Sequence, residues 1–305
     1  MKLNQIRDVV AIADHGSLRA AAQYLGMAQP ALTRSIRELE HELGVSLFDR
    51  HARGMALTPL GKAFIARMRV VQAELQRSRD EMEQMSGRLT GQASIGLSMA
   101  CNIALLPGVL APFKKRFPKV RLKVVEGLFP ELRKQLLDAT LDFYVGPVIG
   151  RPVLRECTVA TLFENECVIL ARKGHPLRSA KSLMALSEAR WIGTQVADHY
   201  EQELGPLFRS HGLKAPLVDT EATSALSALI VVANTDLLAM LPRQYLRFPG
   251  MSQLLQPINV KEPLNAPDIC LVTRSGLPLT PAAEFLSDLI RRTAMAESRL
   301  AIRKT

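Results

Sequence analysis

The stretch from Ser17 to Thr58 reads SLRAAAQYLGMAQPALTRSIRELEHELGVSLFDRHARGMALT. Ser17 belongs to the residue types that favour helix N-caps, and apolar residues follow it at helical spacing, namely Leu18, Ala21, Ala22 and Leu25. Gly26 is typical of a helix end, and Pro30 suits the first turn of a new helix, where its missing N–H costs nothing. The stretch therefore predicts two short helices joined by a tight turn.

The second of these helices has two chemically different faces. One face is apolar and carries Leu32, Ile36, Leu39 and Leu43. The other face is polar and basic and carries Thr33, Arg34 and Arg37. Two short helices of which the second exposes a polar, basic face describe a helix-turn-helix that binds DNA. The alternative is a three-helix packing unit that binds nothing.

The ordered run from Gly16 to Thr58 resembles the N-terminal domain of LysR-type transcriptional regulators. The resemblance implies an all-α winged helix-turn-helix domain over residues 1–58, in which a helix over Leu3–Ala13 packs behind the two helices already described. It also implies a wing over Gly44–Thr58, with short strands at 47–48 and 55–57 and a basic tip between them. Basic side chains at such a tip suit contacts with phosphates or the minor groove, and they equally suit plain solvation.

The candidate DNA-binding residues lie at the start of the first helix, on the second helix and in the wing. They are Leu18, Arg19, Ala28, Gln29, Pro30, Ala31, Thr33, Arg34, Arg37, Arg50 and Arg53. A Gln side chain can read adenine and an Arg side chain guanine in the major groove, although the sequence does not determine which bases they meet.

A long helix is predicted after Thr58-Pro59, running to about Gly87, and residues 59–90 form the expected linker. Apolar residues in this helix follow a heptad spacing that is interrupted by one polar residue, Ser78. The positions on the outward side of the helix are charged. A narrow apolar seam of this length favours pairing with the same helix of a second chain, and the alternative is packing along its own domain. The candidate dimerisation residues are Phe64, Met68, Val71, Leu75, Met82 and Met85.

Residues 91–305 change to an alternation of strands and helices. Strands are predicted at 93–98, 120–126, 142–148, 158–163, 166–171, 237–241 and 269–273, and helices at 105–117, 129–138, 200–211, 224–232 and 281–295. This order predicts α/β units with parallel strands. It resembles the effector domain of the same family, which has the two-lobed fold of type 2 periplasmic binding proteins. The resemblance implies lobe I over 91–163 and 267–305, lobe II over 164–266, and crossovers near 163–166 and 263–268.

Ligands of such sheets bind beyond the carboxyl ends of strands, near helix N-termini. The residues at these places are the candidate effector-binding residues, with Phe129 as a possible aromatic wall. They are Ser98, Met99, Cys101, Asn102, Phe129, Gly146, Val148, Thr194, Gln195, Thr223 and Ser224. Helix capping is the structural alternative for Ser98 and Thr223. Hydroxyls, amides and helix ends suit a small carboxylate or sulfonate as the ligand. Sequence segments such as Leu277–Ala283 resemble those of regulators of aromatic-compound catabolism, so the expected ligand is an aromatic acid.

Enzymatic activity is not expected. Gly96-Leu97-Ser98-Met99-Ala100 departs from the nucleophile elbow G-x-S-x-G at its last glycine, and no local pattern ties His175, His199 or His211 to Ser98 as a base. The six histidines show no metal-binding spacing, and no phosphate-binding or dinucleotide-binding motif occurs, so neither a metal nor a cofactor is expected. The other alternative is a small-molecule-binding module without a DNA role, which the N-terminal 90 residues disfavour.

Charge, cysteines and hydropathy add general limits. The net charge is +10, yet residues 1–58 hold 7 Lys+Arg and 6 Asp+Glu, so DNA binding is inferred from the placement of the arginines rather than from bulk charge. The four cysteines, Cys101, Cys157, Cys167 and Cys270, have apolar neighbours and are expected to be buried, reduced thiols. No export signal or membrane span is evident, so a cytoplasmic protein is expected.

The sequence as a whole therefore predicts a DNA-binding transcriptional regulator whose activity depends on a small organic effector bound between two lobes. The expected partners are double-stranded promoter DNA, the effector, further copies of the chain in a homodimer or homotetramer, and RNA polymerase.

Overall fold

The computed structural model describes residues 1–51, 54–148, 156–194 and 200–302. The chain divides into two compact units, one built mainly from residues 1–88 and the other mainly from residues 89–305. In the described parts of both units, no helix is long and apolar enough to cross a membrane.

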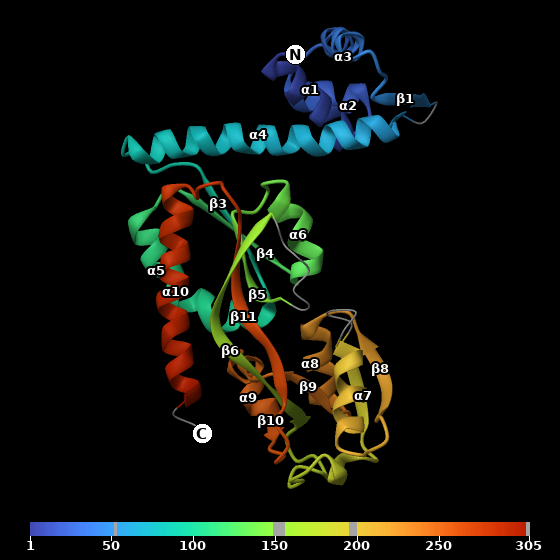
Figure 1. The fold of residues 1–305 in the computed structure, drawn as a ribbon, viewed down its shortest axis with the longest axis vertical. Coiled ribbons are helices and arrows are strands. Elements are labelled where there is room, and N and C mark those ends of the chain that lie inside the picture. Colours follow the sequence, from blue (N-terminus) through green and yellow to red (C-terminus); the bar gives the residue numbers. More distant parts are fainter. Residues whose placement is uncertain (52–53, 149–155, 195–199, 303–305) are drawn as a thin grey trace. The chain divides into compact units, whose positions relative to one another are not determined.

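The N-terminal unit contains three helices and a two-stranded wing: α1 (Leu3–His15), α2 (Leu18–Leu25), α3 (Gln29–Leu43), β1 (Phe48–His51) and β2 (Gly54–Leu57) (Figure 1). The predicted caps are confirmed. The Ser17 hydroxyl accepts a hydrogen bond from Ala20 N at 3.2 Å, and Gly26 closes α2 in the left-handed conformation with φ of 62°. Fully buried side chains from all three helices form one core.

The wing is an antiparallel pair in which Phe48 lies opposite Leu57. The Glu40 carboxylate on α3 accepts hydrogen bonds from Leu47 N at 2.6 Å and Phe48 N at 3.2 Å, which joins the wing to the second helix of the motif. Helix α4 (Pro59–Met85) follows, and the Thr58 hydroxyl caps it by accepting a hydrogen bond from Gly61 N at 2.9 Å. The linker helix was therefore predicted with the correct start.

The C-terminal unit is organised on a mixed sheet. Its strands are β3 (Gln92–Leu97), β4 (Arg121–Glu126), β5 (Phe143–Pro147), β6 (Cys157–Arg172), β9 (Ala239–Pro242), β10 (Leu255–Ile258) and β11 (Asn265–Arg274), in the order β10-β6-β11-β5-β3-β4, with β9 paired to β6. The parallel pairing that we predicted holds for β3 with β4 and β5, whereas β11 runs antiparallel to both β5 and β6.

Lobe I has β3, β4, β5 and the adjacent parts of β6 and β11, with α5 (Met99–Arg116), α6 (Phe129–Leu137) and α10 (Pro281–Ile302) beside them; α5 and α10 pack together (Figure 1). Lobe II adds a second, parallel pair, β7 (Arg190–Thr194) and β8 (Leu217–Ala222), with α7 (Tyr200–Ser210), α8 (Ala225–Asn234) and α9 (Met251–Leu254). Short 3-10 helices lie at Met184–Leu186 and Arg243–Arg247.

The two crossovers are long strands. We predicted separate strands at 158–163 and 166–171, but β6 is one strand of 16 residues that pairs with β11 in its first part and with β9 and β10 in its second. The separation was wrong because the polar residues between the two apolar runs remain paired with β11, where Asn265 lies opposite Glu166. Strand β11 provides the return crossing at the expected place.

Other differences concern element boundaries and short strands. Helix α5 begins at Met99 rather than at 105, because Ser98 caps it and Pro107 and Pro112 are accommodated inside it. Strands β7, β8 and β10 were not predicted; they have only four to six residues each.

Candidate DNA interface and effector pocket

The outward face of α3 carries the candidate recognition residues. Arg34 and Arg37 are exposed, and neither forms a hydrogen bond or ion pair with a described residue. Gln29 and Ala31 are also exposed at the first turn of this helix, where Ala31 N donates a hydrogen bond to Ala28 O at 3.0 Å. Arginine side chains with no internal partner are available for phosphates and base edges.

A buried carboxylate fixes α3 against α1. Asp8 on α1 is 1% exposed, and its Oδ2 accepts a hydrogen bond from the Ser35 hydroxyl on α3 at 2.7 Å. Its Oδ1 accepts a hydrogen bond from Arg7 Nη2 at 2.8 Å. Because Ser35 lies directly between Arg34 and Ile36 in the chain, this contact sets the rotation of the helix that presents the arginines.

The remaining candidate DNA-binding residues have different environments. Arg19, Ala28 and Pro30 are exposed, whereas Leu18 packs against the domain core. The Thr33 hydroxyl donates a hydrogen bond to Gln29 O at 3.0 Å. In the wing, Arg50 pairs through its backbone with Met55, and Arg53 lies outside the described residues.

The candidate dimerisation residues divide into two groups along α4. Met68 is 8% exposed in the core of the N-terminal unit, and the half-buried Phe64 packs against the same core. Val71, Met82 and Met85 are 38%, 58% and 69% exposed, respectively, and Leu75 is half-buried. The exposed part of the seam is therefore its middle and its C-terminal end.

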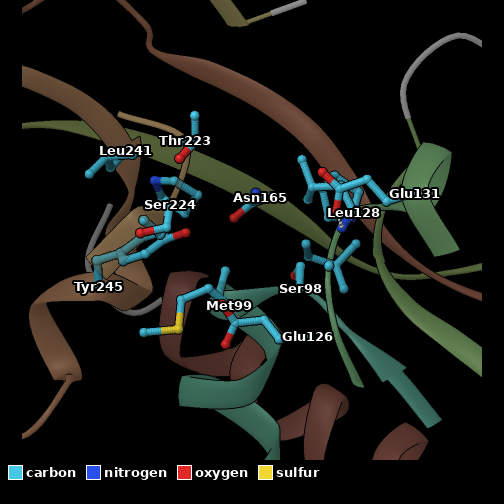
Figure 2. A pocket seen from close by; sticks show the side chains of 16 residues that line it. Ser98, Met99, Glu126, Leu128, Glu131, Asn165, Thr223, Ser224, Leu241 and Tyr245 are labelled. Carbon is cyan, nitrogen blue, oxygen red and sulfur yellow. Dashed lines mark hydrogen bonds between the residues drawn. The ribbon is translucent and has the colours of Figure 1, made fainter. Parts of the chain in front are cut away.

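A pocket of about 230 Å³ lies between the two lobes of the C-terminal unit. Figure 2 shows Ser98 and Met99 of lobe I on one side, Thr223, Ser224 and Tyr245 of lobe II on the other, and Asn165 of β6 between them. The lining is completed by Ala100, Glu126, Gly127, Leu128, Glu131, Pro147, Ala225, Leu241, Pro242 and Ile269.

Two helices begin at this pocket, one from each lobe. Ser98 caps α5 by accepting a hydrogen bond from Cys101 N at 3.4 Å, and Ser224 caps α8 by accepting one from Ser227 N at 3.2 Å. The first turns of both helices, at Met99 and Ala225, line the cavity. Helix N-termini offer backbone N–H donors and a positive dipole end, so both sides of the pocket can bind a hydrogen-bond acceptor.

Four of the candidate effector residues line the pocket, namely Ser98, Met99, Thr223 and Ser224. Five others do not. Cys101 is fully buried in the core of lobe I, Phe129 is buried beside Tyr144, and Gly146 lies in β5 where an added Cβ would stand 2.1 Å from the Tyr144 hydroxyl. Asn102 donates a hydrogen bond to Glu126 Oε2 at 3.3 Å, and Val148 follows β5 without lining the pocket. Thr194 ends β7, and Gln195 lies outside the described residues.

Several lining residues were missed, above all Glu126, Glu131, Asn165 and Tyr245. Glu126 is the last residue of β4, so the same strand-end argument that selected Ser98 would have found it. Asn165 lies in the middle of β6, where no strand-end argument applies.

Among the residues that the structure describes, no histidine lines the pocket near Ser98, and no group of three or more His, Cys, Asp or Glu side chains is arranged to hold a metal. His175 is buried in lobe II; Leu177 N donates to its Nδ1 at 3.0 Å, and its Nε2 lies 3.1 Å from Asp236 O.

All four cysteines are buried free thiols, as predicted. Burial raises the pKa of the Cys101 thiol to about 12, and burial also raises the pKa of Cys157. Because the thiolate is the reactive form, these raised pKa values disfavour reaction of either cysteine at neutral pH.

Comparison with known proteins agrees with both halves of this description. Residues 3–62 match the model of the bacterial regulatory helix-turn-helix protein, lysR family, and residues 86–295 match that of the LysR substrate binding domain. The SDS degradation transcriptional activation protein of a Pseudomonas species is 32% identical over 97% of this chain and 99% of its own. The transcriptional regulator TdcA of Escherichia coli is 26% identical over 90% of this chain and 88% of its own.

The fold has counterparts among solved structures. Full-length CbnR complexed with its target DNA has a TM-score of 0.70 at 20% identity, covering 96% of this chain and all of that one. A winged helix-turn-helix followed by a two-lobed binding domain defines the class of ligand-responsive DNA-binding regulators. Within that class, the chain belongs to the LysR family of transcriptional regulators.

Proposed function

We propose that this regulator acts as a homodimer or homotetramer that binds a two-fold symmetric operator through two copies of α3. Free arginines on the outward face of α3 support DNA reading by that helix, and they are the observation on which this proposal mainly depends. Exposed Val71, Met82 and Met85 support pairing of α4 between chains. Such pairing would place two recognition helices on one duplex.

The effector of this proposal binds in the interlobe pocket and shifts the population of lobe or subunit arrangements. It can do so only by binding one arrangement more tightly than another. In this proposal the protein acts in the cytoplasm. The effector changes the spacing or bending of promoter DNA and thereby changes transcription by RNA polymerase. An organic acid was expected as the ligand, but none of the described lining residues is a Lys, Arg or His that would pair with it.

Arg34→Ala tests the recognition helix. We expect operator affinity to fall roughly tenfold or more, because a bidentate Arg–base contact contributes about 1–3 kcal/mol of discrimination. Gel-shift titration at one fixed salt concentration measures this loss, because affinity for DNA depends strongly on salt.

The matched control is Arg178→Ala, which removes an exposed arginine of lobe II that has no described partner. Circular dichroism and the oligomeric mass should be unchanged in both variants. Equal operator affinity for the Arg34 variant and the unmodified protein would refute the assignment of α3.

A further inference from the structure

Two carboxylates line the lobe I side of the pocket. Glu126 ends β4, and Glu131 lies in the first turn of α6. Glu126 accepts a hydrogen bond from Asn102 Nδ2 and Glu131 accepts one from Leu128 N, each at 3.3 Å, and neither carboxylate forms an ion pair with a described residue. Both carboxylates are exposed, and the described part of the lining contains no basic side chain that pairs with them.

The Glu126 carboxylate of lobe I acts electrostatically on Tyr245 of the opposite lobe. Tyr245 of lobe II is 4% exposed, and its pKa is raised first by burial and then by the Glu126 carboxylate. A negatively charged ligand that met only these groups would be repelled in the same way.

The other side of the pocket offers unpaired donors. Asn165 is 8% exposed; its Oδ1 accepts a hydrogen bond from Gln244 Nε2 at 3.2 Å, while its buried Nδ2 has no partner in the described structure. A buried donor without an acceptor is costly, so a ligand that supplies an acceptor here is favoured. The first turn of α8 adds backbone donors on the lobe II side of the same cavity, whereas α5, whose Asn102 donates to Glu126, lies on the carboxylate side.

We propose that the effector is a small amino-acid-like zwitterion. Its protonated amine binds Glu126 and Glu131 of lobe I, and its carboxylate binds Asn165 Nδ2 and the first turn of α8. Opposite charges on one small molecule match the two chemically different sides of a cavity of about 230 Å³. This inference rests on the proposed function, because it takes the interlobe pocket as the effector site.

A ligand series matched in shape tests the charge requirement on the full chain. Phenylglycine, benzylamine, phenylacetate and phenylacetamide share a ring, and leucine, isoamylamine, 4-methylpentanoate and 4-methylpentanamide form the aliphatic counterpart. We expect thermal shift and calorimetry to show binding by a zwitterion of the series, weaker binding by its amine, and none by its acid or amide.

Glu126→Gln and Glu131→Gln test the two carboxylates, because each keeps the side-chain shape and a hydrogen-bond acceptor. Each should raise the Kd of the zwitterion roughly tenfold or more, since a charge-assisted hydrogen bond is lost. Glu188→Gln is the matched control, because Glu188 is an exposed carboxylate of lobe II outside the pocket, and it should leave the Kd unchanged.

Three outcomes would overturn the inference: tighter binding of the acids than of the zwitterions, unchanged zwitterion affinity in both glutamine variants, or no binding by any member of the series. The proposed function is tested separately by titrating the operator with and without each ligand that binds. If acids bind and change operator affinity, the pocket is an effector site and only the zwitterion proposal fails.

Discussion

At the scale of single residues, Asp8 connects the interior of the N-terminal unit to helix α3, whose outward face is the proposed DNA-binding surface. Its carboxylate is buried, yet both of its oxygens have partners, Ser35 on α3 and Arg7 on α1. A buried charge that is paired in this way is tolerated, whereas removing one partner leaves the other unsatisfied. The orientation of Arg34 is thus determined one residue away, by a contact on the inward side of the helix.

Asp8→Ala should lower the stability of the N-terminal unit by about 2 kcal/mol, because the half-buried Ser35 hydroxyl loses its acceptor. Calorimetry of the full chain measures this change as a lower Tm. The transition of the N-terminal unit is the one that shifts when operator DNA is bound. Asp14→Ala is the control: Asp14 forms an ion pair with Arg69 but is exposed, and its loss should cost less than about 1 kcal/mol. Equal effects of the two substitutions would contradict the role given to Asp8.

At the scale of elements, the helix boundaries of the N-terminal unit were predictable, as was the pocket at the strand ends, but much of the pocket lining was not. Ser17, Gly26 and Thr58 act through their immediate neighbours, so their capping roles can be inferred from the local sequence. Asn165 and Tyr245 meet Ser98 only because β6 passes between the lobes and the 3-10 helix after β9 returns to the same place. That convergence depends on strand pairing between distant segments, which no local pattern contains.

The contact between α4 and the wing depends on the absence of a side chain at Gly61. A Cβ at this position would stand 2.0 Å from Leu47 O, a backbone atom that also accepts a hydrogen bond from Thr58 N at 3.0 Å. Gly61→Ala should therefore force the helix start away from the wing and destabilise the N-terminal unit by about 1–3 kcal/mol, the range of overpacking.

Urea unfolding followed by circular dichroism checks this loss. Lys62→Ala, at the exposed neighbouring position, is the matched control and should change stability by less than about 0.5 kcal/mol. If the Gly61→Ala variant is as stable as the unmodified protein, the backbone at Leu47 can move aside without a loss of folding free energy, and the prediction is wrong.

At the scale of the whole molecule, the proposed pairing of α4 between chains can be tested by placing a charge on the exposed part of its apolar seam. Met82→Asp and Met85→Asp should each raise the dimer dissociation constant at least tenfold, because a charge would be buried without a partner in the paired helices. Light scattering across a dilution series measures this change.

Ala66→Asp introduces the same charge at an exposed position outside the heptad seam and should leave the oligomeric mass unchanged. If all three variants keep the mass of the unmodified protein, α4 is not the oligomer interface.

The continuous strand β6 has a consequence for how the protein folds during synthesis. Its first part needs β11, which lies about a hundred residues later in the chain, and the core of lobe I also contains Ile269, Leu286 and Ile290. Lobe II is therefore a long insertion within lobe I, and the sheet of lobe I stays incomplete until β11 has left the ribosome. Because β11 lies between β6 and β5, truncation shortly before β11 leaves both of these strands with an unpaired edge. Such a product is a substrate for chaperones and proteases rather than a working half-regulator.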